Sequence, residues 1–352
     1  MFTMINKINI EFSDSPLICI CIPTYNAEAT IRETLESILA QSYGNIVVKI
    51  SDNASTDDTL KVIEAIMDSR VSIHRHDVNI GAEGNFTRCV QLAAGKYTAI
   101  FHADDIYEPD MVAKQIVFLE NNSDVGAVFT EAVTIDEQGV PFGVIGGVPG
   151  GRGGVTRIGF RELLQTMMLH QNFLVCPSVM VRTEIFRDEI KEWGGSLFRS
   201  AGDIDTWLRL ASKQTIAVLG EQLMRYRISK AQFSHMNRNR TERADFFLVI
   251  DHYLAKPKVR SLITIDDLRH YGWLERHECV ALAFNLFGLG RVPEAKELLN
   301  GVFCWDAIHA AITSRRGLVT LAGFFLLRVF IPFGSSRKGV AIIKAIKKIS
   351  WR

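Results

Sequence analysis

Residues 17–55, LICICIPTYNAEATIRETLESILAQSYGNIVVKISDNAS, contain two hydrophobic periodicities that follow one another and indicate the fold class. The run Leu17–Ile22 is continuously apolar and rich in β-branched residues, as expected of a strand that is buried on both faces. Residues 31–39 then place apolar side chains at helical spacing, and residues 46–50 form a second apolar run. This strand–helix–strand order predicts a βαβ unit with two parallel strands.

The same alternation continues after this unit. Ser55 and Asp58 predict a capping box at the start of a second helix. A strand is expected near residues 71–74, a helix near 86–93 and another strand near 97–101. Strands separated by helices in this way predict an α/β fold with a mostly parallel central sheet, in which ligands bind beyond the carboxyl ends of the strands.

Polar and acidic residues follow three of the predicted strands at the point where each strand ends. Pro23–Asn26 follow the first strand, Ser51–Ser55 the second, and His102–Asp105 the fourth. Each loop alone is also explained by ordinary turn or cap chemistry, which Asn, Asp and Ser favour. Because the carboxyl ends of parallel strands meet at one edge of a sheet, the three loops together predict a binding site there.

The pair Asp104-Asp105 is the most informative of these motifs. Hard divalent cations bind carboxylate oxygens, and Mg²⁺ needs only one or two protein carboxylates besides water and phosphate oxygens. Such a cation neutralises a nucleotide diphosphate and stabilises it as a leaving group. The alternative is structural, since Asp105 can also begin the helix expected from Pro109 through Leu119.

Four motifs give the chain a resemblance to a known family. PTYN, SDNASTDDT, NIGAEGNF and AAGKYTAIFHADD stand in the order and at the spacing of the family 2 glycosyltransferases, over about residues 16–235. The resemblance implies the GT-A nucleotide-diphospho-sugar transferase fold, a mostly parallel central sheet flanked by helices, followed here by a helical C-terminal region. It also implies an inverting enzyme that moves a sugar from a nucleotide-sugar donor, expected to be a UDP-sugar, to a hydroxyl of a glycan or lipid-linked acceptor, as in the synthesis of cell-surface polysaccharides.

The resemblance implies donor-binding roles by position. Thr24 and Tyr25 match residues that frame the uracil ring, and Asp52-Asn53 match an acidic pair of which one carboxylate accepts the uracil N3 proton. An Asn at the second position can accept that hydrogen bond through its carbonyl oxygen. The implied donor-binding residues are Pro23, Thr24, Tyr25, Asn26, Asp52, Asn53, Asn79, Gly81, Asn85, Arg88, His102, Asp104 and Arg227.

The same resemblance implies a divalent metal, either Mn²⁺ or Mg²⁺. The family often has Asp-x-Asp-Asp where this chain has HADD, with His102 at the first acidic position. Asp105 is therefore expected to bind the metal directly, and Asp104 to hold the ribose or metal-bound waters. His102 either contacts the donor or packs as an ordinary histidine at a strand end. Relatives often have a metal- or diphosphate-binding His at the position of Ser229, and His235 is a candidate substitute for a metal ligand.

The segment AGDIDTWLR, residues 201–209, resembles the family's Glu-Asp-x-Asp-x-Trp-x-Arg motif, whose first Asp takes the proton of the acceptor hydroxyl. By position that catalytic base is Asp203. Asp205 and Arg209 stand one helical turn apart and are expected to form a structural ion pair. Trp207 is expected in the core of the protein in preference to the acceptor site.

Composition predicts two further regions. Residues 139–154, GVPFGVIGGVPGGRGG, are too rich in glycine for a packed element and predict a mobile loop beside the site, or else a simple surface connection. Together with residues 163–177, this loop is expected to shape the pocket for sugar and acceptor. After Tyr226 helical patterns replace strand patterns, and residues 279–287 with 292–299 resemble a helical hairpin.

The C-terminal residues 314–352 contain Lys and Arg but neither Asp nor Glu, in a chain whose formal net charge is +1. Their apolar stretch, residues 318–333, is shorter than the roughly 20 residues that span a bilayer. A basic amphipathic segment of this kind predicts a helix that lies on a membrane, and packing on its own domain or a dimer contact is the alternative. The expected organisation is a transferase domain at residues 1–235, a helical region at 236–313 and a membrane-associating segment at 314–352.

Compartment and competing functions are also inferred from the sequence. The six cysteines show no metal-binding spacing, and the chain does not begin with the basic and apolar segments of a signal peptide. The expected location is the cytoplasm, peripherally on the inner face of the cytoplasmic membrane, and no nucleic-acid partner is expected. A second hypothesis is a catalytically degenerate scaffold that binds sugar nucleotide or glycan, because His102, Gly202 and Ser229 depart from the family pattern.

Overall fold

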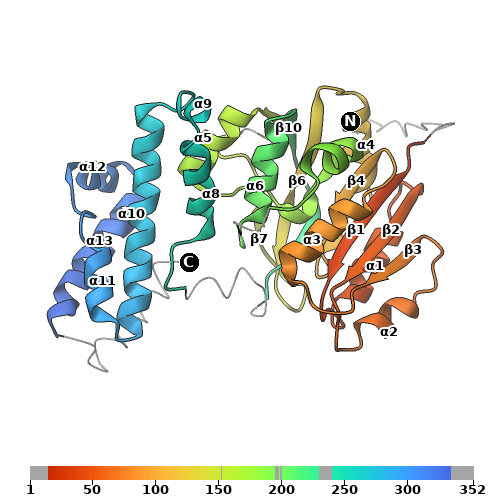
Figure 1. The fold of residues 1–352 in the computed structure, drawn as a ribbon, viewed down its shortest axis with the longest axis horizontal. Helices are drawn as coiled ribbons and strands as arrows, with labels where there is room; N and C mark the ends of the chain where they lie inside the picture. Colours follow the sequence, from red (N-terminus) through yellow and green to blue (C-terminus); the bar gives the residue numbers. More distant parts are fainter. Residues whose placement is uncertain (1–14, 152, 195–197, 199, 230–239, 334–352) are drawn as a thin grey trace, which may run out of the picture.

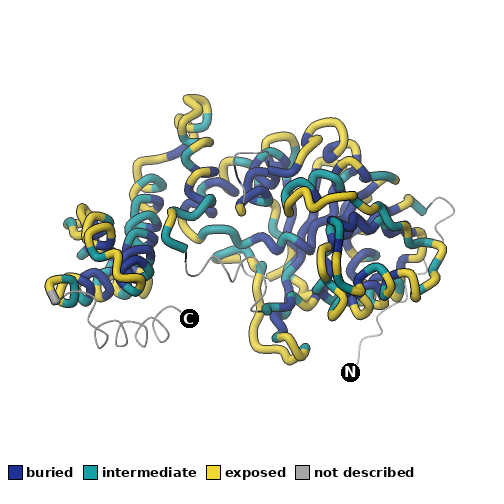
Figure 2. The backbone as a smooth tube through the Cα atoms, turned by 60° about the horizontal axis from the view of Figure 1, so that its bottom comes forward, coloured by how far each residue is buried: buried dark blue, intermediate teal, exposed yellow. Residues whose placement is uncertain are grey.

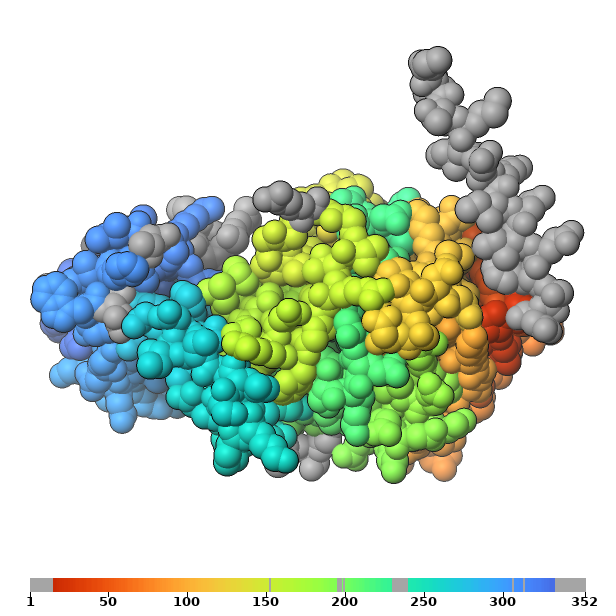
Figure 3. Space-filling model, turned by 90° about the horizontal axis from the view of Figure 1, so that it is seen from above, coloured from red at the N-terminus to blue at the C-terminus, as the bar shows by residue number. Residues whose placement is uncertain are grey.

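The computed structural model describes residues 15–151, 153–194, 198, 200–229 and 240–333. These residues form a ten-stranded mixed sheet flanked by helices, followed by a group of C-terminal helices (Figure 1). In the space-filling view the N-terminal strands and the C-terminal helices lie toward opposite ends of an elongated molecule (Figure 3). The predicted α/β class and the helical C-terminal region are confirmed.

The first half of the sheet contains the four predicted strands. Its elements are β1 (Ile18–Thr24), α1 (Ile31–Leu39), β2 (Ile46–Asp52), α2 (Thr59–Glu64), β3 (Val71–Arg75), α3 (Gly81–Leu92) and β4 (Tyr97–Ile100). The strand order is β3-β2-β1-β4, and each neighbouring pair is parallel. The carboxyl ends of β1, β2 and β4 therefore meet at one edge, as the sequence predicts.

The predicted capping box of Ser55 and Asp58 is wrong. Helix α2 has Asp58 at its N-cap, without a side-chain capping hydrogen bond. Ser55 lies instead at the rim of the sheet, where its Oγ accepts a hydrogen bond from the backbone N–H of Asn26 at 3.0 Å. The N–H of Ser55 donates to Oδ2 of Asp52 at 3.1 Å. Ser55 therefore forms hydrogen bonds within the loops after β1 and β2 and does not cap α2.

The second half of the sheet is mixed. Its elements are β5 (Ile106–Tyr107), α4 (Met111–Glu120), β6 (Val125–Ile135), β7 (Pro141–Ile145), β8 (Val155–Ile158), α5 (Phe160–His170), η1 (Cys176–Ser178), β9 (Met180–Arg182), η2 (Ile185–Ile190), α6 (Gly202–Ala211) and β10 (Thr215–Arg227). Beyond β4 the strand order is β9-β6-β10-β5. Strands β6 and β10 are parallel, whereas β9 is antiparallel to both β4 and β6.

The Gly-rich segment 139–154 is only partly the loop that its composition predicts. Residues 141–145 form strand β7, which pairs antiparallel with β6 and has all five residues exposed. Strand pairing uses backbone groups, so it needs no packed side chains. Gly146 follows β7 at φ +97°, and a Cβ there would lie 2.4 Å from Cγ2 of Val175. The segment therefore packs closely against the loop before η1.

Helices follow β10 in the C-terminal part of the described chain. They are α8 (Asp245–Leu254), α9 (Pro257–Arg260), α10 (Ile265–Gly288), α11 (Val292–Leu298), α12 (Trp305–Thr313) and α13 (Arg315–Phe330). The predicted hairpin is confirmed as α10 and α11, with its first helix extended back to Ile265. Phe284 and Leu327 belong to a hydrophobic cluster that joins α10 and α13.

The central sheet is buried on both faces because side chains alternate along its strands. In β1, Cys19 and Cys21 belong to a core cluster shared with α5, α6 and α8. Ile18, Ile20 and Ile22 belong to a second cluster shared with α1 and α4. Figure 2 shows this buried interior along the strands, with exposed residues concentrated in the connections. Helix α8 thus packs on the sheet domain, although it follows the predicted domain boundary.

Helix α13 begins the segment that is predicted to meet a membrane. Phe324 and Leu327 are buried, so one side of the helix packs on its own domain. Within the described residues, no helix combines the length and the apolar character required to cross a bilayer. Residues 334–352, which carry the predicted basic amphipathic stripe, lie outside the described residues.

Candidate active site

Side-chain amides join the loops at the predicted rim. Asn26, at φ +49°, accepts a hydrogen bond at Oδ1 from the backbone N–H of Thr56 at 2.8 Å. Asn85 on α3 donates from Nδ2 to the carbonyl oxygens of Ser51 at 2.9 Å and Thr24 at 3.3 Å. These bonds join the loops after β1 and β2 to each other and to α3. The Asn residues predicted to bind the donor therefore also shape the rim.

Asn53 fixes the loop that begins α3. Its Nδ2 donates to Oδ1 of Asn79 at 3.0 Å and to the carbonyl oxygen of Gly81 at 3.1 Å. Its Oδ1 accepts from the backbone N–H of Ile80 at 2.9 Å. The amide is thus engaged within the protein, which makes the neighbouring Asp52 the stronger candidate for a nucleobase contact.

Asp52 offers a buried acceptor at this rim. Its carboxylate is 0% exposed, and Oδ2 receives the Ser55 N–H and lies 3.7 Å from Nε of Arg75. Oδ1 is buried without a hydrogen-bond partner in the described part of the chain. An unpaired buried carboxylate oxygen is costly, and a ligand donor would remove that cost. Tyr25, in the loop after β1, is 48% exposed and offers an aromatic face to a planar group.

Arg88 lies on α3 toward β3. Its guanidinium is 3.4 Å from Oε1 of Gln91 on the same helix. Its charge also lowers the pKa of His74 on β3, after the larger effects of desolvation and of Lys49. The structure thus places Arg88, one of the implied donor-binding residues, near β3, whereas the acidic loop follows β4.

The loop after β4 brings together His102, Asp104 and Asp105. One imidazole nitrogen and one oxygen of each carboxylate lie within 4.8 Å of one another. Asp105 is 0% exposed, and its Oδ1 accepts from the backbone N–H of Arg227 at 2.8 Å. Desolvation, followed by the charge of Asp104, raises the pKa of Asp105 well above its ordinary value. Helix α4 has Asp110 at its N-cap, so the capping alternative for Asp105 is excluded.

These groups fit a divalent cation. Oδ2 of Asp105 is buried and has no hydrogen-bond partner among the residues described. A buried, unpaired carboxylate oxygen close to a second carboxylate and an imidazole is a suitable donor set for a metal ion. A cation bound there would also offset the repulsion between Asp104 and Asp105. His235, the third predicted metal ligand, lies outside the described residues.

Arg227 holds the acidic loop from the end of β10. The residue is buried, and its Nε donates to the carbonyl oxygen of Asp104 at 2.9 Å. Nη1 donates to the carbonyl oxygens of Asp136 and Glu137, and Nη2 pairs with Oε2 of Glu33 at 2.6 Å. These bonds engage all three guanidinium nitrogens. Arg227, predicted as a donor contact, is therefore placed to position the carboxylates.

Asp203 lies in the first turn of α6, where the resemblance places the base. Its Oδ2 accepts a hydrogen bond from Nδ2 of Asn172 at 2.9 Å. Desolvation raises the pKa of Asp203 to about 6, against the lowering effects of two backbone N–H groups and of Asn172. A carboxylate with this pKa is ionised at neutral pH and is a competent proton acceptor.

Cys176 links the two acidic centres. Desolvation raises the pKa of its thiol well above the ordinary value, and the charges of Asp203 and Asp105 raise it further. Both carboxylates thus act on one side chain at the start of η1. The predicted base and the predicted metal ligand, which are far apart in the sequence, therefore both lie toward the start of η1.

The rest of α6 is anchored by polar and aromatic contacts. Nε of Arg209 pairs with Oδ2 of Asp205 at 2.7 Å, and the hydroxyl of Tyr253 donates to Oδ1 of Asp205 at 3.0 Å. Trp207 is 0% exposed and packs edge-to-face on Phe129. The structural roles predicted for the ion pair and for Trp207 are confirmed.

Gly202 is required by packing in this chain. A Cβ at this position would lie 2.9 Å from Cδ1 of Trp193. Trp193 stacks on Phe86, with 4.7 Å between ring centroids, and Phe86 meets the imidazole of His102 edge-to-face at 5.5 Å. A row of rings thus connects the start of α6 to the loop after β4. The acidic residue that the family usually has at this position would collide with that row.

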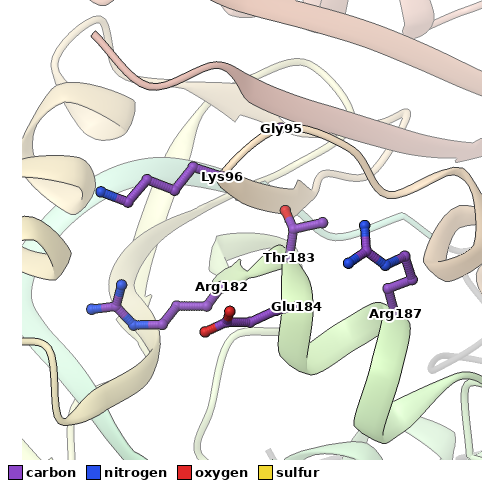
Figure 4. A pocket seen from close by; sticks show the side chains of 6 residues that line it. All are labelled: Gly95, Lys96, Arg182, Thr183, Glu184 and Arg187. Carbon is purple, nitrogen blue, oxygen red and sulfur yellow. The ribbon is translucent and has the colours of Figure 1, made fainter. Parts of the chain in front are cut away.

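A separate pocket of about 250 Å³ lies at the opposite end of β4 (Figure 4). Lys96, Arg182 and Arg187 line it. Lys96 pairs with Glu120, Arg187 pairs with Asp188, and the guanidinium of Arg182 donates to backbone carbonyl oxygens. These cations already have partners, so the rim and not this pocket is the candidate active site.

Sequence patterns do not single out Asn172, Cys176 or Glu33. Asn172 and Cys176 fall within residues 163–177, which are expected only in general terms to shape the pocket. None of the three belongs to a motif with its own chemical signature. Asn172 and Glu33 are distinguished by hydrogen bonds to Asp203 and Arg227 that the fold creates, and Cys176 by the charges of Asp203 and Asp105, which raise the pKa of its thiol.

Comparison with known sequences identifies related proteins. Residues 19–189 match the family described as Glycosyl transferase family 2. An uncharacterized glycosyltransferase of Methanocaldococcus jannaschii is 27% identical over 272 residues, which cover 76% of this chain and 83% of that protein. The Escherichia coli UDP-Glc:alpha-D-GlcNAc-diphosphoundecaprenol beta-1,3-glucosyltransferase WfaP is 38% identical over 104 residues, which cover 30% of this chain and 41% of that protein.

Two solved structures share the fold. S. aureus TarS 1-349 in complex with UDP-GlcNAc has a TM-score of 0.59 at 16% identity, and the match covers 89% of this chain and 91% of that one. The mannosyltransferase PcManGT from Pyrobaculum calidifontis, in complex with GDP-Man and Mn²⁺, has a TM-score of 0.52 at 18% identity, covering 95% of this chain and 87% of that one. The predicted GT-A fold is thereby confirmed.

Proposed function

From its membership of the family 2 glycosyltransferases through residues 19–189, we propose that this chain transfers a sugar from a UDP-sugar to a hydroxyl of a glycan or lipid-linked acceptor. The transfer would serve polysaccharide synthesis. It would invert the anomeric configuration and use a divalent cation. One observation carries the proposal: Oδ2 of Asp105 is buried without a hydrogen-bond partner among the described residues, and one atom each of His102, Asp104 and Asp105 lie within 4.8 Å of one another. An inverting transfer needs one group to deprotonate the acceptor and another to stabilise the leaving group. Asp203 would take the first task and a cation at Asp105 the second.

The donor would lie along the loops after β1, β2 and β4. Oδ1 of Asp52 would accept the N3 proton of uracil, and the exposed ring of Tyr25 would stack on the base. The TarS structure contains UDP-GlcNAc, and the name of the E. coli relative includes UDP-Glc, which supports UDP as the nucleotide.

Asp105 and Asp104 would hold the cation, either Mn²⁺ or Mg²⁺. A cation held there would neutralise the diphosphate and stabilise the charge that the departing nucleotide gains. The presence of Mn²⁺ in the PcManGT structure supports a metal in a protein of this fold. Arg227, braced by Glu33, would keep the two carboxylates in position.

Asp203 would act as the general base. It would take the proton of the acceptor hydroxyl while that oxygen attacks the anomeric carbon from the face opposite the nucleotide, which inverts the anomeric configuration. Asn172 would orient the carboxylate through its 2.9 Å hydrogen bond. The pKa of about 6 supports this role, because the carboxylate is then ionised at neutral pH without being a very weak base.

The C-terminal helices would hold the enzyme on the inner face of the cytoplasmic membrane. On α13, Leu318, Phe325 and Val329 are exposed at the spacing of one helical stripe, and Trp305 on α12 is 85% exposed. Residues 314–352 carry basic but no acidic side chains, which favours an anionic lipid surface. The name of the E. coli relative includes a diphosphoundecaprenol acceptor, which supports a lipid-linked acceptor at such a surface.

A sugar-transfer assay tests this proposal against the scaffold hypothesis. The full chain is incubated with Mn²⁺, a panel of UDP-sugars and GDP-Man, and an undecaprenyl-diphosphate-linked sugar, and the anomeric configuration of the product is determined by NMR. We expect inverted product from a UDP-sugar and none after addition of EDTA. Nucleotide binding without transfer to any acceptor offered would favour the scaffold hypothesis. Transfer from GDP-Man alone would refute a UDP-sugar as the donor. A retained anomeric configuration would contradict the role of Asp203 as the base of an inverting transfer.

A further inference from the structure

We propose that the imidazole of His102 is a direct ligand of the cation beside Asp105, and that its nitrogen makes the site prefer Mn²⁺ to Mg²⁺. This inference rests on the proposed metal-assisted function and specifies the ion that the site takes. It concerns the position in the HADD loop where the family usually has a carboxylate.

The position of the ring supports direct ligation. Nδ1 of His102 lies 4.0 Å from Oδ2 of Asp105, which is too far for a hydrogen bond. Metal–ligand bonds to nitrogen and oxygen are about 2.1 Å long, so the separation is slightly less than the length of two such bonds. One ion can therefore bind both atoms with little movement of either residue.

The oxygen that faces the ring has no competing partner. Oδ2 of Asp105 is buried without a hydrogen-bond partner in the described part of the chain. The other oxygen of Asp105 is occupied by the N–H of Arg227. Asp105 is fully buried, so water does not solvate the unpaired oxygen. Asp105 is thus left with one unpaired oxygen for a ligand, 4.0 Å from Nδ1 of His102.

The imidazole is also held at the rim. The backbone N–H of His102 donates to the hydroxyl of Tyr107 at 2.7 Å, and the ring packs edge-to-face against Phe86 at 5.5 Å. The side chain is 23% exposed, so an ion at this position could still bind phosphate oxygens and water. Fixed orientation with one open side is what a metal site that also binds substrate needs.

A nitrogen ligand changes which ion binds best. Mg²⁺ binds oxygen ligands and loses its water reluctantly, whereas first-row transition-metal ions accept imidazole. A histidine in place of a carboxylate also removes one negative charge, which weakens Mg²⁺ binding most. His102→Asp, which restores the family pattern, is therefore expected to lower the ratio of Mn²⁺ affinity to Mg²⁺ affinity by about tenfold.

Pulsed EPR of Mn²⁺ bound to the full chain, with and without UDP, tests the ligation directly. A nitrogen coupled to the Mn²⁺ electron spin reports a bound imidazole. We expect this coupling in the wild-type protein and its loss in His102→Asp, which should still bind Mn²⁺. His235→Gln is the matched control for the other candidate histidine and should retain the coupling.

Three results would overturn the proposal. They are Mn²⁺ bound to the wild-type protein without nitrogen coupling, coupling that survives in His102→Asp, and no binding of Mn²⁺ at all. The sugar-transfer assay tests the proposed function separately. Transfer that persists in EDTA would show that the reaction needs no metal, while the glycosyltransferase activity itself would stand.

Discussion

The backbone N–H of Arg227 donates a 2.8 Å hydrogen bond to Oδ1 of Asp105, which joins the end of β10 to the loop after β4. The guanidinium of Arg227 completes the connection through the carbonyl oxygen of Asp104 and the carboxylate of Glu33. A buried carboxylate is thereby oriented by a strand that lies far away in the sequence. Oδ2 of Asp105 remains as the oxygen that can bind a cation.

Replacing Arg227 should therefore damage both stability and metal binding. Arg227→Met removes a buried guanidinium whose three nitrogens are all hydrogen-bonded, so we expect a loss of about 3 kcal/mol in the free energy of unfolding. Glu33→Gln should cost less than about 1 kcal/mol, because Glu33 is largely exposed. Urea unfolding measures the stability of both variants, and titration measures their affinity for Mn²⁺. Equal stability of the two variants would show that the hydrogen bonds of the Arg227 guanidinium are not needed.

Asp203→Asn should remove the base without removing the donor site. The amide has nearly the same shape as the carboxylate but cannot take a proton, so kcat should fall by about 10²-fold or more. Binding of UDP should change little, because the implied donor residues lie on other loops. Steady-state kinetics and calorimetry on the same preparation separate the two effects. Normal turnover in this variant would place the base elsewhere.

The pH dependence of kcat/KM should report the pKa of Asp203. The base works when ionised, so activity should rise with pH below about 6 and level off above it. Asn172 donates to the charged form, so its loss in Asn172→Ala should raise that pKa and move the rising limb to higher pH. A shift to lower pH, or a profile that is flat between about pH 5 and 7, would contradict this assignment.

Gly202→Ala tests the packing at the start of α6. The added Cβ would meet Trp193 at 2.9 Å, and we expect a destabilisation of about 1–3 kcal/mol. Gly44→Ala is the matched control, because a Cβ at Gly44 meets nothing within 4 Å. Thermal unfolding compares the two. If both variants melt alike, Gly202 is not constrained by packing and its departure from the family pattern needs another reason.

The exposed stripe of α13 should contribute to membrane binding. The double variant Phe325→Ser, Val329→Ser removes two exposed apolar side chains, and the lost burial in lipid is worth about 2 kcal/mol or more. Co-sedimentation with anionic vesicles should fall by about tenfold or more. Met67→Ser, at a residue that is 90% exposed in the sheet domain, is the control and should bind as wild type does. Undiminished binding by the double variant would assign the membrane contact to another surface.

Much of the fold was predictable because it follows local periodicity. The apolar runs at residues 18–22 and 46–50 are strands, and the stripe at 31–39 is a helix. The polar loops at the ends of β1, β2 and β4 were predictable as one rim because parallel topology requires it. The capping box at Ser55 was not, since a hydrogen bond to Asn26 from the neighbouring loop outweighs the local pattern.

The contacts around the candidate carboxylates depend on packing between distant segments. Nothing in the sequence around Asn172 shows that it bonds to Asp203, and nothing around Glu33 shows that it braces Arg227. From the local motif alone, Gly202 is interpreted only as the loss of the acidic residue that is usual in the family. Only its approach to Trp193 shows why a side chain does not fit there. Such relationships come from tertiary structure and have no period or spacing in the chain.

Isothermal titration with UDP measures whether the donor site needs a metal at Asp105. The titration is made with and without Mn²⁺, on the wild-type protein and on Asp105→Asn. The amide keeps an oxygen that can accept the Arg227 N–H but loses the charge that holds a cation. We predict that the wild-type protein binds UDP tightly only with Mn²⁺, and that the variant loses this enhancement. Equal binding of UDP by both proteins, with or without metal, would contradict a metal-assisted donor site at Asp105.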